Sequence, residues 1–311
     1  MNILITGIHG FVGSNLVLAL NKHYNLYGLG ITPTQKEGVI KIFSWKDFEN
    51  KTLPDVDAII HLAGKAHDTK NRSEAKVYFD VNTGLTEKIY DYFLRSTAKK
   101  FIFFSSVKAA ADTVEDKILA ENIIPMPKGP YGESKIAAEN YINNHPTKKN
   151  VYILRPCMIH GPGNKGNLNL LYNLIKKRIP WPLGAFENYR TFTSIDNLCY
   201  IIEGLLTKNV ESGIYHIADD EALSTNELIN IMCSTMNRKA HIWKINKGII
   251  KGCARLGDIL HLPLNSERLR KLTENYVASN AKIKKALGVD NLPVHAKDGL
   301  SKTIKYFEKK I

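Results

Sequence analysis

The 311-residue chain contains no run of eighteen apolar residues, and Met1 leads directly into a short apolar segment. We therefore expect neither a transmembrane span nor a signal peptide. The four cysteines are scattered and form no Cys-x-x-Cys pair, which favours free thiols in a reducing cytoplasm. There is also no internal repeat and no low-complexity segment. These absences predict a cytoplasmic globular protein, and we expect no metal site.

Acidic residues are scarce relative to basic ones. There are 30 Asp and Glu against 43 Lys and Arg, which gives a formal net charge of +13. This excess suits an anionic partner, which is a nucleotide, a nucleic acid or an anionic membrane surface. The lysines are spread along the chain without interleaved aromatic residues, so nucleic acid is the least expected of the three, and we expect none.

The first residues follow the pattern of a dinucleotide-binding unit. Residues 2–6 form an apolar run that predicts a buried strand, and a helix with apolar periodicity follows up to Leu20. Between them, Gly7, Gly10 and Gly13 permit a tight turn, close approach of the backbone to a pyrophosphate, and close packing of helix on strand. The phosphates then lie at the positive end of the helix. A glycine triplet indicates dinucleotide binding when it follows a strand and precedes a helix, which is the order here.

Further apolar runs alternate with helical patterns. They predict strands at 26–29, 57–62, 101–104, 151–154 and 214–217. This alternation predicts an α/β fold with a Rossmann-type, doubly wound parallel sheet that binds ligands at the carboxyl ends of its strands. We expect a dinucleotide-binding domain at 1–165 and a smaller, mainly substrate-binding lobe at 166–311, with roughly 190–218 returning to the first domain.

The second predicted strand ends at Gly30. A carboxylate there would bind the adenosine ribose of NAD, whereas a nearby arginine would favour the phosphate of NADP. This chain has neither, and its nearest basic side chain is Lys36. These residues leave both cofactors open.

The chemistry is expected at the stretch from Tyr131 to Lys135, which opens a predicted helix. Residues four apart share a helix face, and an ammonium near a phenol lowers its pKa from about 10 toward the working range of a general acid/base. Alone the pattern is weak, because it occurs by chance on many helix faces. Ser106, at the end of the strand predicted at 101–104, is a candidate partner, although a serine there is more often a cap.

A second helical pattern lies between residues 244 and 260. Its apolar positions are Ile245, Ile249, Cys253, Leu256 and Leu260, and its basic positions are Lys244, Lys247, Lys251 and Arg255. A basic amphipathic helix can contact a membrane surface. A solvated basic face beside an apolar face that covers a core is the commoner arrangement, and we expect it here.

Together these motifs resemble the extended short-chain dehydrogenase/reductase family, in particular its nucleotide-sugar epimerases and ketoreductases. The resemblance runs over nearly the whole chain. Besides the glycine loop, Ser106 and the Tyr131 to Lys135 stretch, it rests on His61 to Gly64, Asn82 with Gly84 to Thr86, Arg155 to Gly163, Asn167 with Leu168, Arg190 to Phe192 with Asp196 and Asn197, and Ser279 to Ile283 before Leu287 and Gly288.

The resemblance implies that Ser106, Tyr131 and Lys135 are catalytic. Tyr131 would exchange a proton with a sugar hydroxyl as hydride moves to or from the nicotinamide, Ser106 would hydrogen-bond that oxygen, and Lys135 would hold the cofactor ribose and lower the Tyr131 pKa. The implied cofactor site comprises Gly7, Gly10, Phe11, Val12, Gly13, Leu62, Ala63, Gly64, Asn82, Tyr131, Lys135 and Pro156. The implied substrate contacts are Ser106, Asn167, Arg190 and Arg268.

Some positions depart from the family pattern. The usual Val-Tyr-Gly after the serine is replaced by alanines at 109–111, a usual tyrosine is His160, and the acid after the second strand is Gly30. The dehydratase branch carries an Asp-Glu pair directly after the serine, whereas this chain has Val107 and Lys108. Dehydration is therefore not expected.

We expect a cytoplasmic, homodimeric NAD(P)-dependent nucleotide-sugar 4-epimerase that works through a 4-keto intermediate, with NAD slightly preferred and a UDP-sugar as the favoured substrate. The alternative is an NAD(P)H-dependent reductase of 4-keto-6-deoxy nucleotide sugars, which the stretch at 279–283 also resembles. A silent dinucleotide-binding sensor is less favoured, because all three catalytic positions hold competent residues.

Overall fold

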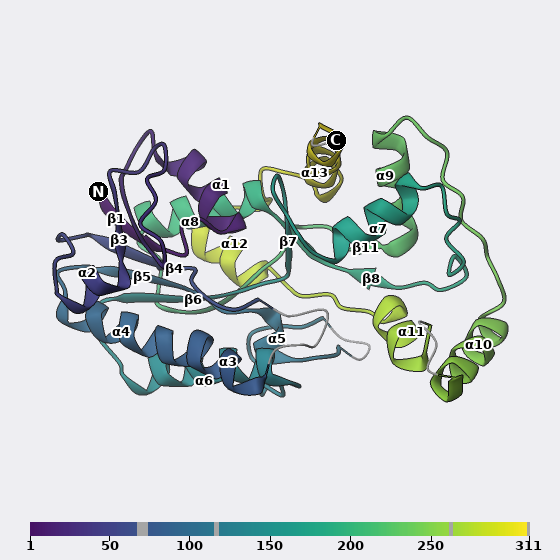
Figure 1. The fold of residues 1–311 in the computed structure, drawn as a ribbon, viewed down its shortest axis with the longest axis horizontal. Coiled ribbons are helices and arrows are strands. Elements are labelled where there is room, and N and C mark those ends of the chain that lie inside the picture. The colour runs from purple at the N-terminus through teal and green to yellow at the C-terminus, as the bar shows by residue number, and fades with distance from the viewer. Residues whose placement is uncertain (67–73, 115–117, 261–263, 310–311) are drawn as a thin grey trace.

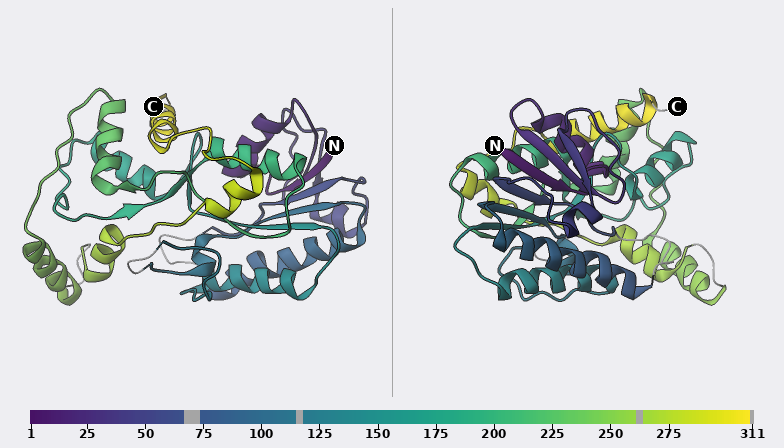
Figure 2. Two further views of the ribbon diagram at one scale, coloured as in Figure 1. Left: turned by 180° about the vertical axis from the view of Figure 1, so that it is seen from behind. Right: turned by 60° about the vertical axis from the view of Figure 1, so that its left-hand side comes forward.

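The computed structural model describes residues 1–66, 74–114, 118–260 and 264–309 (Figure 1). A parallel sheet lies between two layers of helices, and a smaller lobe built mostly of short helices lies beside it (Figures 1 and 2). This arrangement confirms the expected α/β, Rossmann-type architecture.

The seven-stranded sheet has the order β10-β6-β5-β4-β1-β2-β3, and every neighbouring pair is parallel. Its strands are β1 (Asn2–Thr6), β2 (Asn25–Gly30), β3 (Lys41–Ser44), β4 (Ala58–His61), β5 (Lys100–Phe104), β6 (Asn150–Pro156) and β10 (Gly213–Ile217). The chain winds outward from β1 to β3 and returns at β4, so the winding direction reverses between β1 and β4. In open parallel sheets, ligands bind at this switch point.

Helices cover both faces of the sheet, which explains why its strands are apolar almost throughout. One face carries α1 (Phe11–Leu20), α8 (Ile195–Thr207) and α12 (Ala281–Leu287), and the other carries α4 (Leu85–Arg95) and α6 (Pro130–Asn144). Short segments beside the second layer are α2 (Trp45–Glu49), α3 (Ala75–Tyr78), the π-helix η1 (Phe79–Gly84) and α5 (Val107–Ala110).

The smaller lobe has its own apolar core, to which Trp181, Met232 and Leu300 contribute. Its helices are α7 (Asn167–Lys176), α9 (Thr225–Thr235), α10 (Lys247–Leu260), α11 (Ser266–Thr273) and α13 (Ala296–Lys309). Two short strand pairs join it to the sheet region: β7 (Met158–His160) with β9 (Phe192–Ser194), and β8 (Tyr189–Arg190) with β11 (Leu223–Ser224). The exact division near residue 165 stays a prediction. All four cysteines are free, and no helix of the described ranges is long and apolar enough to cross a membrane.

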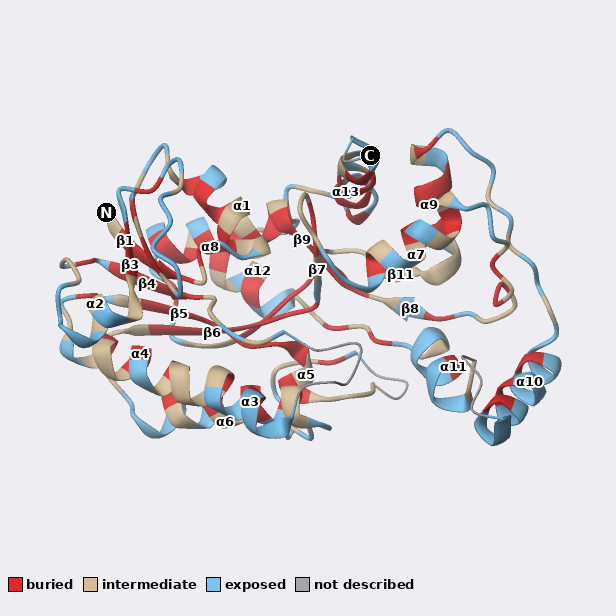
Figure 3. Cartoon of the chain, in the orientation of Figure 1, coloured by how far each residue is buried: buried red, intermediate tan, exposed pale blue. Residues whose placement is uncertain are grey.

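The expected orientation of α10 is wrong. Of the apolar face that was expected to cover a core, only Ile245, just before the helix, packs against the lobe core; Ile249, Cys253, Leu256 and Leu260 are exposed (Figure 3). The side that packs inward instead carries Ile250, Ala254 and Gly257. A methyl group placed on Gly257 would clash with the carbonyl oxygen of Leu264, so the helix uses its smallest residues for close backbone packing before α11.

Candidate active site

The loop between β1 and α1 approaches the end of β4 so closely that it requires glycine. Gly7 has φ +70°, and a methyl group on it would lie 2.9 Å from the backbone nitrogen of Ala63. A methyl group on Gly13 would lie 2.6 Å from the carbonyl oxygen of Gly7. The two sides of the switch point therefore meet backbone to backbone.

The N-terminal end of α1 is suited to an anion. Gly10 precedes the helix, no side chain caps this end, and the first turn, which begins with Phe11 and Val12, contains no acidic residue. Backbone amides at such an end point outward, and the helix dipole favours negative charge there. The structure thus fits the pyrophosphate of a dinucleotide at the expected place.

A buried polar chain fixes the loop after β4. The Thr6 hydroxyl lies 2.7 Å from Nδ1 of His61, and Nε2 of His61 lies 3.0 Å from the Thr86 hydroxyl. The backbone amide of Ala63 donates to the same Thr6 oxygen over 3.0 Å. Burial, and secondarily the charge of Lys135, lower the pKa of His61 to about 3, so the imidazole is neutral and serves as a bridge. Leu62 to Gly64 are held rigidly as a result.

Asn82 joins this loop to the helix that carries the candidate catalytic tyrosine. It lies fully buried in η1, and its side-chain oxygen accepts from the Lys65 amide over 2.8 Å. Its amide nitrogen donates to the Ser134 hydroxyl of α6 over 3.0 Å. A methyl group on Gly64 would lie 2.9 Å from the Asn82 oxygen and 3.2 Å from Nζ of Lys135. Residues from three distant segments therefore converge at the end of β4, around a π-helical turn of the kind often found at functional sites.

Ser106 and Tyr131 are hydrogen-bonded to each other. Ser106 follows β5 and caps α5, where its hydroxyl accepts from the Lys108 amide over 3.2 Å. Tyr131 stands in the first turn of α6, and its ring meets the edge of Tyr78 at a centroid distance of 6.3 Å. The serine and the tyrosine that were predicted to act together are thus adjacent.

The electrostatics of Tyr131 differ from the expectation. Burial raises the pKa of its phenol, and the hydrogen bond from Ser106 lowers it by less. The expected lowering of this pKa is therefore wrong for the chain on its own. Lys135 shares the helix, but its ammonium donates to the Phe104 carbonyl oxygen over 2.8 Å. Burial lowers the pKa of Lys135 to about 8, against the opposing charge of Glu139.

One buried ion pair beneath this site was not anticipated. Glu139, one helical turn after Lys135, lies 2.6 Å from a guanidinium nitrogen of Arg155 on β6, and both side chains are almost completely buried. The Ser105 hydroxyl also donates to Glu139. An acid four residues after Lys135 within an apolar stretch was the available signal. The sequence contains no signal for the contact of Tyr78 with Tyr131, because the two residues are far apart in the chain.

The remaining predicted site residues lie on separate elements and are not brought together. Pro156 ends β6 and is buried, Asn167 is exposed at the start of α7, and Arg268 is exposed on α11. Arg190, on β8, donates to the carbonyl oxygens of Lys271 and Glu274 near the end of α11, where helix carbonyls need partners. Arg190 therefore anchors the helix that carries Arg268.

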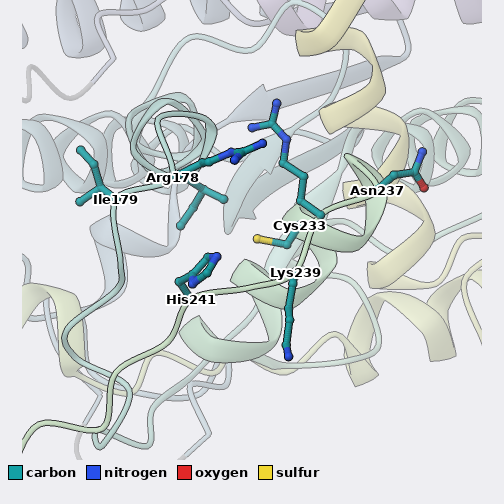
Figure 4. A pocket seen from close by; sticks show the side chains of 8 residues that line it. Arg178, Ile179, Cys233, Asn237, Lys239 and His241 are labelled. Carbon is teal, nitrogen blue, oxygen red and sulfur yellow. The ribbon is translucent and has the colours of Figure 1, made fainter.

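The lobe also has a basic surface cavity of about 250 Å³ near the C-terminal ends of α7 and α9 (Figure 4). It is lined by Ile175, Arg178, Ile179, Cys233, Asn237, Arg238, Lys239 and His241. None of the predicted site residues lines it, so it is separate from the candidate active site.

The model of the NAD dependent epimerase/dehydratase family matches residues 3–218. The chain belongs to this family. It is therefore an enzyme of the extended short-chain dehydrogenase/reductase type, and the cofactor of its family is NAD, as the motifs led us to expect.

Relatives with known names catalyse more than one reaction. The UDP-glucose 4-epimerase of Vibrio cholerae is 29% identical over 251 residues, which are 76% of each chain. The GDP-6-deoxy-D-talose 4-dehydrogenase of Aggregatibacter actinomycetemcomitans is 27% identical over 241 residues, 75% of this chain and 79% of its own. The crystal structure of a Bacillus cereus UDP-glucuronic acid 4-epimerase with UDP-glucuronic acid and NAD superimposes over all of both chains, with a TM-score of 0.75 and 22% identity.

Proposed function

We propose that this protein is an NAD-dependent nucleotide-sugar 4-epimerase that works through a 4-keto intermediate. The observation that carries the proposal is the hydrogen bond between Ser106 and Tyr131 at the end of β5, one helical turn from Lys135. It brings a proton carrier and a second hydroxyl to the edge of the sheet where the glycine loop lies.

The cofactor in this proposal is NAD, bound across the switch point. The backbone amides at the N-terminal end of α1, where Gly10 leaves the helix uncapped by a side chain, would hold its pyrophosphate. Gly64, Asn82 and Lys135 lie close together at the end of β4 and would contact the cofactor, as would Leu62, Ala63 and Pro156 at the strand ends. When bound, NAD accepts a hydride from the sugar and returns it.

The side chains of this chain move and hold the proton. Tyr131, as the phenolate, takes the proton of the 4-hydroxyl as hydride leaves the adjacent carbon, and the sugar becomes a ketone. Ser106 donates a hydrogen bond to the same oxygen throughout. After the ketone presents its other face, hydride returns to carbon 4 and Tyr131 returns the proton to the oxygen. Burial raises the pKa of Tyr131, and the ammonium of Lys135, one helical turn away, would stabilise the phenolate against this rise.

Epimerisation also needs a firm grip on the part of the substrate that does not turn. We assign this role to Asn167 and Arg268 in the smaller lobe, with Arg190 holding the helix that carries Arg268. The substrate in this proposal is a UDP-sugar, in keeping with the names of the epimerases to which the chain is similar. Arginine suits a diphosphate because it is permanently charged and binds two oxygens at once. A homodimeric assembly in the cytoplasm stays a prediction.

The second candidate is one-way reduction of a 4-keto-6-deoxy nucleotide sugar. The similarity to a GDP-6-deoxy-D-talose 4-dehydrogenase favours it, as does the stretch at 279–283. Both reactions use Ser106, Tyr131 and Lys135 in the same way. They differ in the cofactor, which an epimerase regenerates and a reductase consumes at every turnover.

The experiment follows from this difference. The purified enzyme is incubated with UDP-N-acetylglucosamine or UDP-glucose and a catalytic amount of NAD, and the sugars are followed by NMR. We expect the 4-epimer to accumulate without net formation of NADH. If no epimer forms, and 4-keto-6-deoxy nucleotide sugars oxidise NADH or NADPH one for one, the reductase replaces the epimerase.

A further inference from the structure

We propose that α10 binds the surface of a bilayer that contains anionic phospholipid. This surface is separate from the candidate active site, and the inference does not depend on which reaction that site catalyses. It rests on the sequence of α10, on its exposure and on its position in the molecule.

The helix presents three distinct faces. At 100° per residue, its inward side carries the residues that pack toward the lobe and α11. The adjoining sector, about 120° wide, is apolar although it faces solvent. Its large side chains are Ile249, Leu256, Ile259 and Leu260, which are 61%, 57%, 71% and 63% exposed. The third sector, about 80° wide, carries Lys247, Lys251 and Arg255 together with the one acid, Asp258, all exposed.

Exposing the apolar sector of α10 to water is unfavourable. Single exposed apolar side chains are common, but four on a 14-residue helix form a contiguous stripe that favours contact with an apolar partner. Trp243, 55% exposed just before the helix, adds a side chain that suits the boundary between lipid and water. An apolar stripe beside a basic one is the arrangement of helices that lie in the plane of a membrane interface.

The charged residues of α10 indicate which kind of partner it contacts. The single acid of α10, Asp258, is occupied by the amide and hydroxyl of Ser266, at 3.0 and 2.5 Å. Among the ion pairs of the described residues, none involves Lys251 or Arg255. A second copy of the helix would bring the same uncompensated positive charge to the contact. An anionic lipid surface instead complements both this sector and the net charge of +13.

The position of α10 leaves it accessible to a flat surface. It lies at the far end of the smaller lobe and projects beyond α7 and α9 in every view (Figures 1 and 2). Its 14 residues extend about 21 Å, which is shorter than the roughly 30 Å hydrocarbon core of a bilayer. The helix can therefore lie on the membrane but cannot span it.

The test is co-sedimentation of the full chain with vesicles of defined composition. We expect binding to phosphatidylglycerol–phosphatidylethanolamine vesicles at low salt, weaker binding at high salt, and little binding to phosphatidylcholine. Replacing Lys247, Lys251 and Arg255 by Gln should weaken binding about a hundredfold, because each basic residue near an anionic surface contributes about fivefold. Replacing Ile249, Leu256 and Leu260 by Ser should weaken it at least about tenfold.

Matched variants separate this surface from general charge and hydrophobicity. The charge control replaces Lys22, Lys297 and Lys305 by Gln, and the apolar control replaces Leu18, Ile40 and Ile179 by Ser; all six residues are exposed elsewhere. Both controls should bind vesicles much as the wild type does, and circular dichroism should show every variant folded. The proposal is overturned if the wild type does not bind anionic vesicles or if the controls lose binding equally. It is also overturned if the apolar α10 variant binds vesicles normally but dissociates a dimer in analytical ultracentrifugation, which would identify a second copy as the occupant.

Discussion

The two ends of the molecule hold their candidate functional residues in different ways. At the sheet edge, Asn82, Ser106 and Lys135 are buried and bonded to side chains or backbone of neighbouring elements. In the smaller lobe, Asn167 and Arg268 are exposed. The sheet edge is therefore preorganised by the fold, whereas Asn167 and Arg268, which we propose to contact the substrate, are exposed to solvent. Catalysis needs fixed geometry at the groups that react.

The largest effect is expected when the proton carrier Tyr131 at the sheet edge is replaced. Tyr131→Phe keeps the ring and loses the hydroxyl, so turnover should fall about 10²–10⁴-fold while NAD affinity, measured by titration, stays nearly constant. Tyr189→Phe, in the lobe and half exposed, is the matched control and should retain activity. A Tyr131→Phe enzyme with at least a third of wild-type turnover would remove Tyr131 from the mechanism.

The next effect concerns the buried pair beneath the site. Glu139→Leu leaves the Arg155 guanidinium buried without its partner and should lower the free energy of unfolding by about 3–5 kcal/mol. Combining it with Arg155→Met should restore much of the loss, since no charge then remains buried. Glu267→Ala breaks an exposed pair with Lys271 in the lobe and should change stability little. Denaturant titration of the four proteins checks this, and equal losses at Glu139 and Glu267 would contradict it.

The same contrast explains what the sequence predicted. The glycine loop, the strand ends and the spacing of Tyr131 and Lys135 are constraints on the backbone, and each leaves a signal in residue type or period. The contacts of Arg190 with α11 and the exposed side of α10 depend on how helices dock across the lobe. Apolar periodicity alone did not reveal that Ala254 and Gly257 would form the inward side of α10.

A third effect depends on pH. The folded-state pKa of Lys135 is about 8, below its unfolded value of 10.5. The unfolded chain therefore binds more protons between these values, and stability should rise as the pH increases through that range. We expect the wild type to gain about 2 kcal/mol relative to Lys135→Met between pH 8 and pH 10, measured by denaturant unfolding at both pH values. Parallel stability curves for the two proteins would show that Lys135 does not titrate there.

The smallest effect is expected on the preference between NAD and NADP, when Gly30 is replaced. Gly30 has no positive φ, and a methyl group on it would have ordinary contacts of 3.8 and 3.9 Å, so Gly30→Asp should fold. Its carboxylate should repel the phosphate of NADP and shift the preference toward NAD by about tenfold, or about 1.4 kcal/mol. The wild type should bind the two cofactors within about tenfold of each other. Titration of apo-protein that gives a hundredfold preference in the wild type would mean that another residue recognises the ribose.

Transfer of the hydride itself tests the proposed reaction most directly. The enzyme is given UDP-glucose that carries deuterium at carbon 4, with a catalytic amount of NAD in ordinary water. If hydride leaves carbon 4, stays on the bound cofactor and returns to the opposite face, the 4-epimer retains the deuterium at carbon 4, as NMR and mass spectrometry will show. A 4-epimer that has lost the deuterium to solvent would mean proton abstraction at carbon instead, and would contradict hydride transfer at Tyr131.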